Sequence, residues 1–254
     1  VGIKGAPMTQ FFSIHGQVKD KNLGMGLVIE NDITGARLMQ GVYAQMAYSF
    51  RLNKRYHRLS IGLNAGLDIL QTNFADLQTN ENDQADPLRA NQSIISPNAG
   101  VGLYYYANKF YAGFSIPRLL SRTNGLALGS QSMHSQIFDP LFYLSVGYVF
   151  TFHLNWTLKT SALLKLQSDV PVVFDIGVSV IWMDKFYTGI SYRYHESVIF
   201  TTMYRFHKRM YAGYSFDIPI NGLALNQWGT HEISLSYQWG RELNKRKTSS
   251  CFYY

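Results

Sequence analysis

Charged residues and cysteine are both scarce in this sequence. Lys, Arg, Asp and Glu together make up 15% of the 254 residues, whereas a soluble domain usually carries about 25%. Cys251 is the only cysteine, so no disulfide can form within the chain and no CxxC pair offers a zinc site. The low charge content indicates that part of the surface faces something other than water.

Long apolar runs are missing as well. The uncharged stretch 140–158 contains Ser145, Gly147, His153 and Asn155, and it alternates between apolar and polar residues. A transmembrane helix needs about 20 mainly apolar residues in succession. The remaining way to cross a bilayer is a closed β-barrel, in which every backbone polar group is paired.

Catalytic and cofactor motifs are also absent. The sequence has no GxSxG, no phosphate-binding loop and no complete GxGxxG, and His231-Glu232 lacks the second histidine of a zinc protease. No serine pattern accompanies His15, His195 or His231, as a phospholipase would require. The acidic stretch 81–86 lacks the glycine and the terminal glutamate of a calcium loop. We therefore expect no enzymatic activity, no metal and no cofactor.

Alternation of apolar and polar side chains is the dominant pattern. Between residues 59 and 69 every odd position is apolar, and the even positions carry Ser, Gly, Asn, Gly and Asp. Such period-two patterns are typical of β-strands with one apolar face. Thirteen strands are predicted, at 8–18, 22–31, 38–50, 58–72, 96–106, 110–117, 138–151, 154–166, 172–183, 186–195, 198–206, 210–217 and 230–240.

These strands predict an all-β fold, a transmembrane antiparallel up-and-down β-barrel of the bacterial outer membrane. Because single-chain bacterial barrels have an even number of strands, we expect one further strand before Val1, which makes fourteen. Residues 1–240 are predicted to form the barrel and residues 241–254 a basic periplasmic tail. The longest connections, 73–95, 118–137 and 218–229, are expected outside the cell, since periplasmic turns are short.

Six charged side chains fall on the polar parity of their strands. An Arg or Lys on the lipid face near the middle of the bilayer would cost about 2–4 kcal/mol. We therefore predict that all six face the barrel lumen, where they can meet water or an opposite charge. They are Asp68, Lys159, Lys165, Asp175, Arg193 and Glu232.

Positive charge is concentrated at the predicted periplasmic end. Fifteen of the 23 Lys and Arg residues map to its turns and the tail, against three acids, so this rim has a net charge near +12. One interpretation is attraction to anionic lipid. The other is docking of an acidic periplasmic protein, whereas nucleic acid is not expected in this compartment. The residues predicted to contact a partner are Arg51, Lys54, Arg55, Arg58, Arg205, Lys208, Arg209, Lys245, Arg246 and Lys247.

Six short blocks of sequence are spread over nearly the whole chain. They are 1–7 (VGIKGAP), the segment from Gly24 to Gly35 with Asn31-Asp32, 96–105 (SPNAGVGLYY), 110–117 (FYAGFSIP), 213–217 (GYSFD) and 230–237 (THEISLSY). In this order the blocks resemble the PorP/SprF family of type IX secretion membrane proteins. The C-terminal end departs from the family, because it reads Ser250-Cys-Phe-Tyr-Tyr254 in place of Ser-Pro-Arg-Tyr-Phe.

The resemblance implies a non-enzymatic, outer-membrane role in the type IX secretion and gliding apparatus of Bacteroidota. Some family members are core components that associate with periplasmic ring lipoproteins and a peptidoglycan-binding protein. Others serve one large secreted adhesin, which they help to secrete or hold at the cell surface. Both roles are open at this point, and so is the alternative of a passive porin or a channel for hydrophobic solutes.

Overall fold

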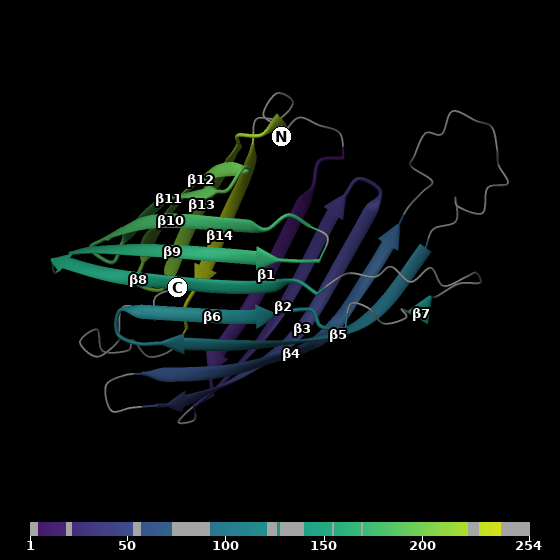
Figure 1. The fold of residues 1–254 in the computed structure, drawn as a ribbon, viewed down its shortest axis with the longest axis horizontal. Helices are drawn as coiled ribbons and strands as arrows, with labels where there is room; N and C mark the ends of the chain where they lie inside the picture. Colours follow the sequence, from purple (N-terminus) through teal and green to yellow (C-terminus); the bar gives the residue numbers. More distant parts are fainter. Residues whose placement is uncertain are drawn as a thin grey trace.

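One antiparallel sheet accounts for the architecture (Figure 1). The computed structural model describes residues 5–18, 22–52, 57–72, 92–120, 126–127, 140–153, 155–168, 170–222 and 229–239. Thirteen strands lie side by side in chain order, and the two-residue β7 pairs with β5 outside this path. The strands are β1 (Met8–Gln17), β2 (Leu23–Thr34), β3 (Arg37–Arg51), β4 (Arg58–Thr72), β5 (Gln92–Tyr106), β6 (Phe110–Ile116), β7 (Leu126–Ala127), β8 (Phe142–His153), β9 (Trp156–Leu166), β10 (Val173–Trp182), β11 (Phe186–Arg193), β12 (Ser197–His207), β13 (Met210–Pro219) and β14 (Thr230–Tyr237).

The prediction of an all-β, antiparallel, up-and-down fold is confirmed. Each of the thirteen predicted strands corresponds to a strand of the structure, whereas β7 falls within the predicted connection 118–137. The largest differences in strand bounds are at β5, which begins at Gln92 instead of 96, and at β8, which begins at Phe142 instead of 138. The predicted tail, 241–254, lies outside the described residues. No helix in the described ranges is long and apolar enough to span a membrane.

The two ends of the sheet differ in the length of their connections. At one end, which we call the turn end, the strands are joined through 18–22, 52–57, 107–109, 154–155, 183–185 and 208–209. At the other, the loop end, they are joined through 35–36, 73–91, 117–141, 167–172, 194–196 and 220–229. The prediction that the longest connections share one end therefore agrees with the strand order.

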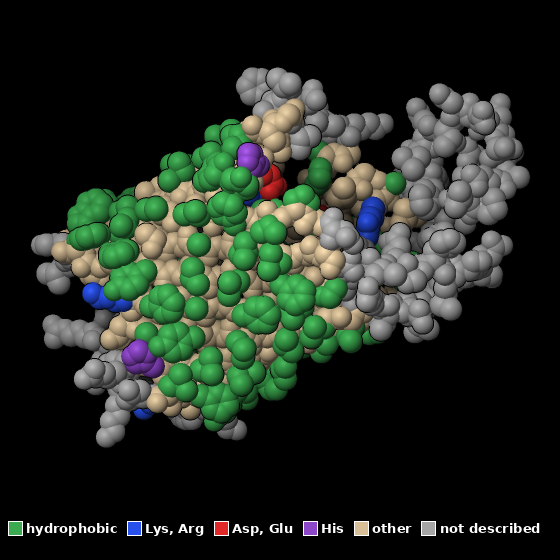
Figure 2. All heavy atoms as spheres, viewed as in Figure 1, with side chains coloured by type: hydrophobic (Ala, Val, Ile, Leu, Met, Phe, Trp, Pro, Cys, Tyr) green, Lys and Arg blue, Asp and Glu red, His purple; other side chains and the backbone are tan. Residues whose placement is uncertain are grey.

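Side-chain alternation gives the curved sheet an apolar outer face. Along β11 the exposed positions alternate with partly buried ones, and Phe186 and Ile190 are among the exposed. Figure 2 shows hydrophobic side chains spread over the face of the sheet that it presents. Figure 1 shows the sheet curling round an interior. The alternate positions of the strands, which lie on the inner face, are mostly polar. β1 and β14 are the edges of the strand order. Closure of a barrel in a bilayer requires partners for the backbone groups of these edges.

Aromatic side chains on the outer face form two belts. Near the turn end, Trp156, Trp182, Phe186 and Tyr204 make a continuous row across β9–β12, with ring centroids 6.0, 5.6 and 4.6 Å apart. Near the loop end, the pairs are Phe114–Phe142, Phe174–Tyr194 and Phe216–His231. On β10 the two belts are separated by the eight residue steps from Phe174 to Trp182. That is about 26 Å along a strand, or about 20 Å across the bilayer for a strand tilted by about 40°, which is of the same order as the apolar band of about 25 Å of a transmembrane barrel.

Candidate functional site in the charged interior and at the turn end

The chain after β6 folds inward across the inner face of the sheet. A Cβ atom at Gly100 on β5 would lie 2.3 Å from the carbonyl oxygen of Pro117 and 2.6 Å from that of Ile116. Only glycine leaves room for the backbone at this crossing. The Asn64 side chain on β4 donates a hydrogen bond to the Pro117 carbonyl over 3.3 Å. The crossing delivers the next residue, Arg118, to the interior.

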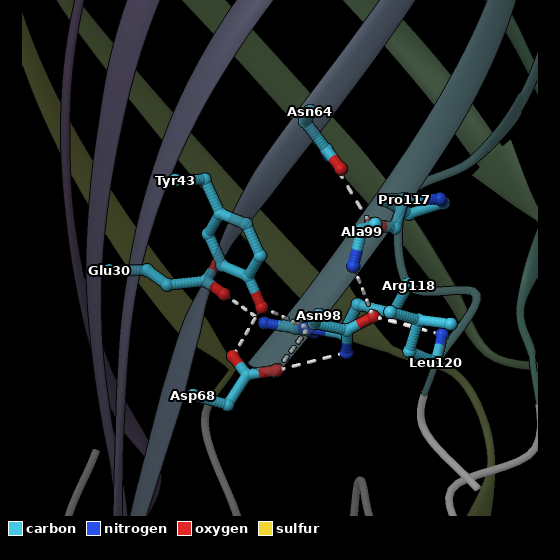
Figure 3. Close-up of polar contacts among 9 residues, drawn as sticks. All are labelled: Glu30, Tyr43, Asn64, Asp68, Asn98, Ala99, Pro117, Arg118 and Leu120. Atoms are coloured by element: carbon cyan, nitrogen blue, oxygen red, sulfur yellow. Dashed lines mark hydrogen bonds and ion pairs between the residues drawn. The ribbon is translucent and has the colours of Figure 1, made fainter. Parts of the chain in front are cut away.

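Arg118 is the centre of a polar network in the loop half of the interior (Figure 3). Its guanidinium forms an ion pair with Glu30 and lies 3.5 Å from Asp68. Its Nε donates to the Tyr43 hydroxyl over 3.1 Å, and that hydroxyl donates to Asp68. Asn98 donates to the same carboxylate over 3.1 Å. We call these five residues the Arg118 network.

The Arg118 network ties four strands to the segment after β6. Glu30, Tyr43, Asp68 and Asn98 come from β2, β3, β4 and β5, which are consecutive neighbours in the sheet. Asn98 is only 4% exposed, and its amide oxygen accepts hydrogen bonds from the backbone N–H groups of Ala99 and Leu120. A partly buried charge is costly unless it is paired. The network therefore stabilises the inward fold of the chain as well as the wall behind it.

Arg193 is the centre of a second charged cluster, which involves strands β10 to β13. It makes two hydrogen bonds to Asp175 on β10, over 3.1 and 3.3 Å, in the forked geometry that guanidinium and carboxylate favour. It also contacts Asp217 on β13 at 3.4 Å and Glu196 at 3.8 Å. Ser197, the cross-strand partner of Arg193 on β12, is 2% exposed. This Arg193 cluster links β10 to β13.

The two halves of the interior differ in charge. The loop half contains Arg118 and Arg193 surrounded by carboxylates. The turn half contains cations at inward positions, and no acid takes an inward position there in the described part of the chain. The inward acids of the loop half are Glu30, Asp32, Asp68, Asp175, Asp217 and Glu232. The inward cations of the turn half are Arg51, Arg58, Lys159 and Arg205.

Comparison with known families shows which family has this sequence pattern. Residues 1–237 match the family described as type IX secretion system membrane protein PorP/SprF. The chain belongs to the PorP/SprF family. The match includes every strand of the sheet, from β1 to the last residue of β14, and it confirms the resemblance seen in the six sequence blocks. No relative among curated proteins matches the sequence.

The structure of this PorP/SprF protein brings together only some of the residues predicted to face the lumen. Asp175 and Arg193 form a pair. Asp68 lies in the Arg118 network, and the Lys159 ammonium lies 5.3 Å from the ring centroid of Tyr111. The other two lie near the loop end: Lys165 on β9 is in register with Val173, and Glu232 on β14 is exposed in register with Ser215.

Arg118 and its partners Glu30, Tyr43 and Asn98 were not singled out by sequence reasoning. The alternation of β6 places even-numbered residues outward, as for the exposed Phe110 and Phe114. A charged Arg118 would break that pattern, and it follows Pro117. A charge on the wrong parity directly after a proline is a signal that the chain has left the strand.

The cations predicted to contact a partner divide into two groups. Lys208 and Arg209 are exposed in the β12–β13 turn, whereas Arg51, Arg58 and Arg205 take inward positions at strand ends. Asp184 is the one acid at the turn end within the described ranges. The remaining predicted contact residues lie outside the described residues: Lys54, Arg55, Lys245, Arg246 and Lys247.

Across the residues that the structure describes, no group of three or more His, Cys, Asp or Glu side chains could hold a metal ion.

Proposed function

We propose that this PorP/SprF protein is a non-enzymatic outer-membrane component of the type IX secretion and gliding apparatus, with its turn end in the periplasm as a docking surface for acidic protein partners. The observation that carries the proposal is the charge of the turn end. Against the single described acid, Asp184, stand seven described cations: Arg51, Arg58, Lys109, Lys185, Arg205, Lys208 and Arg209.

Membrane placement and orientation rest on the outer face and on the connections. The two aromatic belts have the spacing of the two interfaces of a bilayer, where aromatic rings are enriched. Short turns on the periplasmic side and long loops outside are the rule for bacterial outer-membrane barrels. This orientation turns the basic end toward the periplasmic part of the secretion apparatus.

Protein partners are favoured over lipid as the counterpart of this charge. Outward cations at a membrane interface can attract anionic headgroups, but Arg51, Arg58 and Arg205 are on the inward parity of their strands. Complementary charge steers protein association and sets orientation. Periplasmic ring lipoproteins and a peptidoglycan-binding protein are the proposed partners at this end, and the C-terminal domain of a large secreted adhesin is proposed at the loop end.

A passive porin or solute channel is the second candidate, and the polar interior favours it. However, the inward fold at Pro117 places the Arg118 network across the inner face. This network narrows the route that a solute would take through the interior. Planar bilayer recordings separate the two functions. Steady ion conductance by the purified protein would favour the porin, and a closed baseline would favour the docking component.

Crosslinked affinity purification from native outer membranes, followed by mass spectrometry, tests the docking proposal. Lys208→Glu/Arg209→Glu should reduce recovery of periplasmic partners severalfold. The matched control is Arg89→Glu/Arg122→Glu, which reverses two cations in the two longest loop-end connections. Equal recovery from both variants and the wild type would contradict the proposal. Recovery of one giant surface protein without ring proteins would identify an adhesin anchor instead of a core component.

A further inference from the structure

A single row of hydrogen-bond donors crosses four neighbouring strands inside the turn half. Arg51 on β3 is the cross-strand partner of Arg58 on β4, Arg58 is the partner of Tyr106 on β5, and Tyr106 is the partner of Tyr111 on β6. The Lys159 ammonium lies over the Tyr111 ring and extends the row by one more cation. We call these five residues the donor row.

Side-chain parity places the donor row on the inner face of the sheet. Arg51 and Arg58 share the parity of Tyr43 on β3 and Asp68 on β4, both of which contact Arg118 in the interior. Tyr106 shares the parity of the buried Asn98 on β5 and is itself only 9% exposed. The Tyr111 ring lies over Gly147 on β8, where a Cβ atom would come within 2.2 Å of it. The row is therefore directed away from lipid.

The two arginines of the row are cross-strand partners with the same charge, so they repel each other. Like charges directly opposite each other on neighbouring strands are destabilising. Neither Arg51 nor Arg58 makes an ion pair within the described ranges of the chain, in contrast to Arg118 and Arg193. An anionic ligand would relieve this repulsion, because guanidinium groups bind carboxylates through paired hydrogen bonds.

We infer that the donor row is a binding site for an extended acidic peptide segment that enters the interior from the turn end. From Arg51 to Tyr111 the row spans three strand-to-strand spacings, or about 14 Å. Alternate side chains of an extended peptide lie about 7 Å apart. The length of the row therefore matches about three carboxylates of such a peptide, and it is longer than a single phosphate or lipid headgroup. The carboxylates of the loop half and the inward fold at Pro117 confine the peptide to the turn half. The inference rests on the proposed function for the side from which the peptide enters.

Peptide binding by the purified barrel in zwitterionic detergent tests this inference. The probe is fluorescein-labelled hexaglutamate, its binding is followed by fluorescence anisotropy, and hexaglutamine is the neutral control peptide. Arg51→Gln/Arg58→Gln should weaken hexaglutamate binding about tenfold or more, because the two guanidinium groups supply the charge-assisted hydrogen bonds to the carboxylates. Lys208→Gln/Arg209→Gln removes the same charge outside the row and should weaken binding less than about twofold.

Several results would overturn the inference. They are equal weakening in both double variants, equal binding of hexaglutamine, and displacement of the peptide by inorganic phosphate or by phosphatidylglycerol vesicles at matched ionic strength. Heat-modifiable gel migration shows that each variant is folded, and Arg51→Lys/Arg58→Lys, which keeps the charge, should retain part of the affinity. The two proposals can fail separately. If Lys208→Glu/Arg209→Glu loses its native partners but Arg51→Gln/Arg58→Gln still binds hexaglutamate, the donor-row inference alone is wrong. If Lys208→Glu/Arg209→Glu keeps its native partners but Arg51→Gln/Arg58→Gln loses hexaglutamate binding, the docking proposal alone is wrong.

Discussion

The loop half and the turn half of the interior use inward-facing charge in different ways. In the loop half, Arg118 contacts two carboxylates and Arg193 contacts three. In the turn half, Arg51 and Arg58 face each other and make no ion pair within the described residues. Opposite charges that pair with one another stabilise the sheet. Like charges that repel one another can instead be paired by a partner of opposite charge. The comparison therefore separates residues that stabilise this PorP/SprF protein from residues proposed to carry its function.

Removal of Arg118 should have the largest effect on stability. Arg118→Met leaves Glu30 and Asp68 uncompensated, and it should lower the free energy of unfolding by about 2 kcal/mol, a value reduced from that of a fully buried pair because these side chains are partly exposed. Guanidinium unfolding in detergent micelles, followed by tryptophan fluorescence, measures the change. In a Glu30→Gln/Asp68→Asn background the same substitution should cost much less. A cost of the same size in both backgrounds would contradict the pairing.

Two glycines on the inner face of β5 offer a matched test of the inward fold. Gly100→Ala places a Cβ against the Pro117 carbonyl and should cost about 1–3 kcal/mol. At Gly102 the nearest atom to a new Cβ is 3.5 Å away, an ordinary contact, so Gly102→Ala should be nearly neutral. The same unfolding measurement applies to both variants. Equal costs would show that chain 117–120 does not cross the wall at Gly100.

The Arg193 cluster should respond to its two aspartates unequally. Asp175→Asn removes a carboxylate with two hydrogen bonds to Arg193 and should cost about 1–2 kcal/mol. Asp217→Asn disturbs one contact at 3.4 Å and should cost less than half as much. Thermal midpoints from heat-modifiable migration rank the two variants. A larger effect of Asp217→Asn would show that Arg193 is held mainly from β13.

Neutralising one cation of the turn half should give the smallest change, with the opposite sign. Arg51→Gln removes a like-charge pair and should raise the free energy of unfolding by a few tenths of a kcal/mol. The gain should shrink at high salt, because salt screens the repulsion. Unfolding at low and at high sodium chloride measures both effects. Destabilisation by Arg51→Gln, comparable with that of Arg118→Met, would erase the difference between the two halves.

Local alternation was enough to predict the strands and the all-β fold of this protein, because each strand reports its own two faces through its own sequence. Alternation also assigns Asp175 and Arg193 to one side of the sheet. Their pairing depends on the register between β10 and β11, which places them as direct cross-strand partners. Register is a property of two segments and cannot be read from either segment alone.

The partners of Arg118 could not be predicted from the sequence for a related reason, although Pro117 signals that the chain leaves the strand. Its position depends on Gly100, on a different strand, which admits the backbone of Pro117. The alternation of β6 assigns Arg118 to the outward parity, and only the three-dimensional crossing reverses this assignment. The donor row has the same origin, because Arg51, Arg58, Tyr106 and Tyr111 become a row only through three successive registers.

Partner recovery by a barrel altered only in the turn half tests the central claim most directly. Native outer membranes that carry Arg51→Gln/Arg58→Gln are crosslinked, and the recovered periplasmic proteins are quantified relative to folded barrel. Because Arg51 and Arg58 face each other as like charges, their neutralisation should not destabilise the protein. We predict a normal amount of folded barrel and a loss of partner of about tenfold, equivalent to about 1.4 kcal/mol. Recovery at the wild-type level would contradict the assignment of partner binding to the inward cations of the turn half.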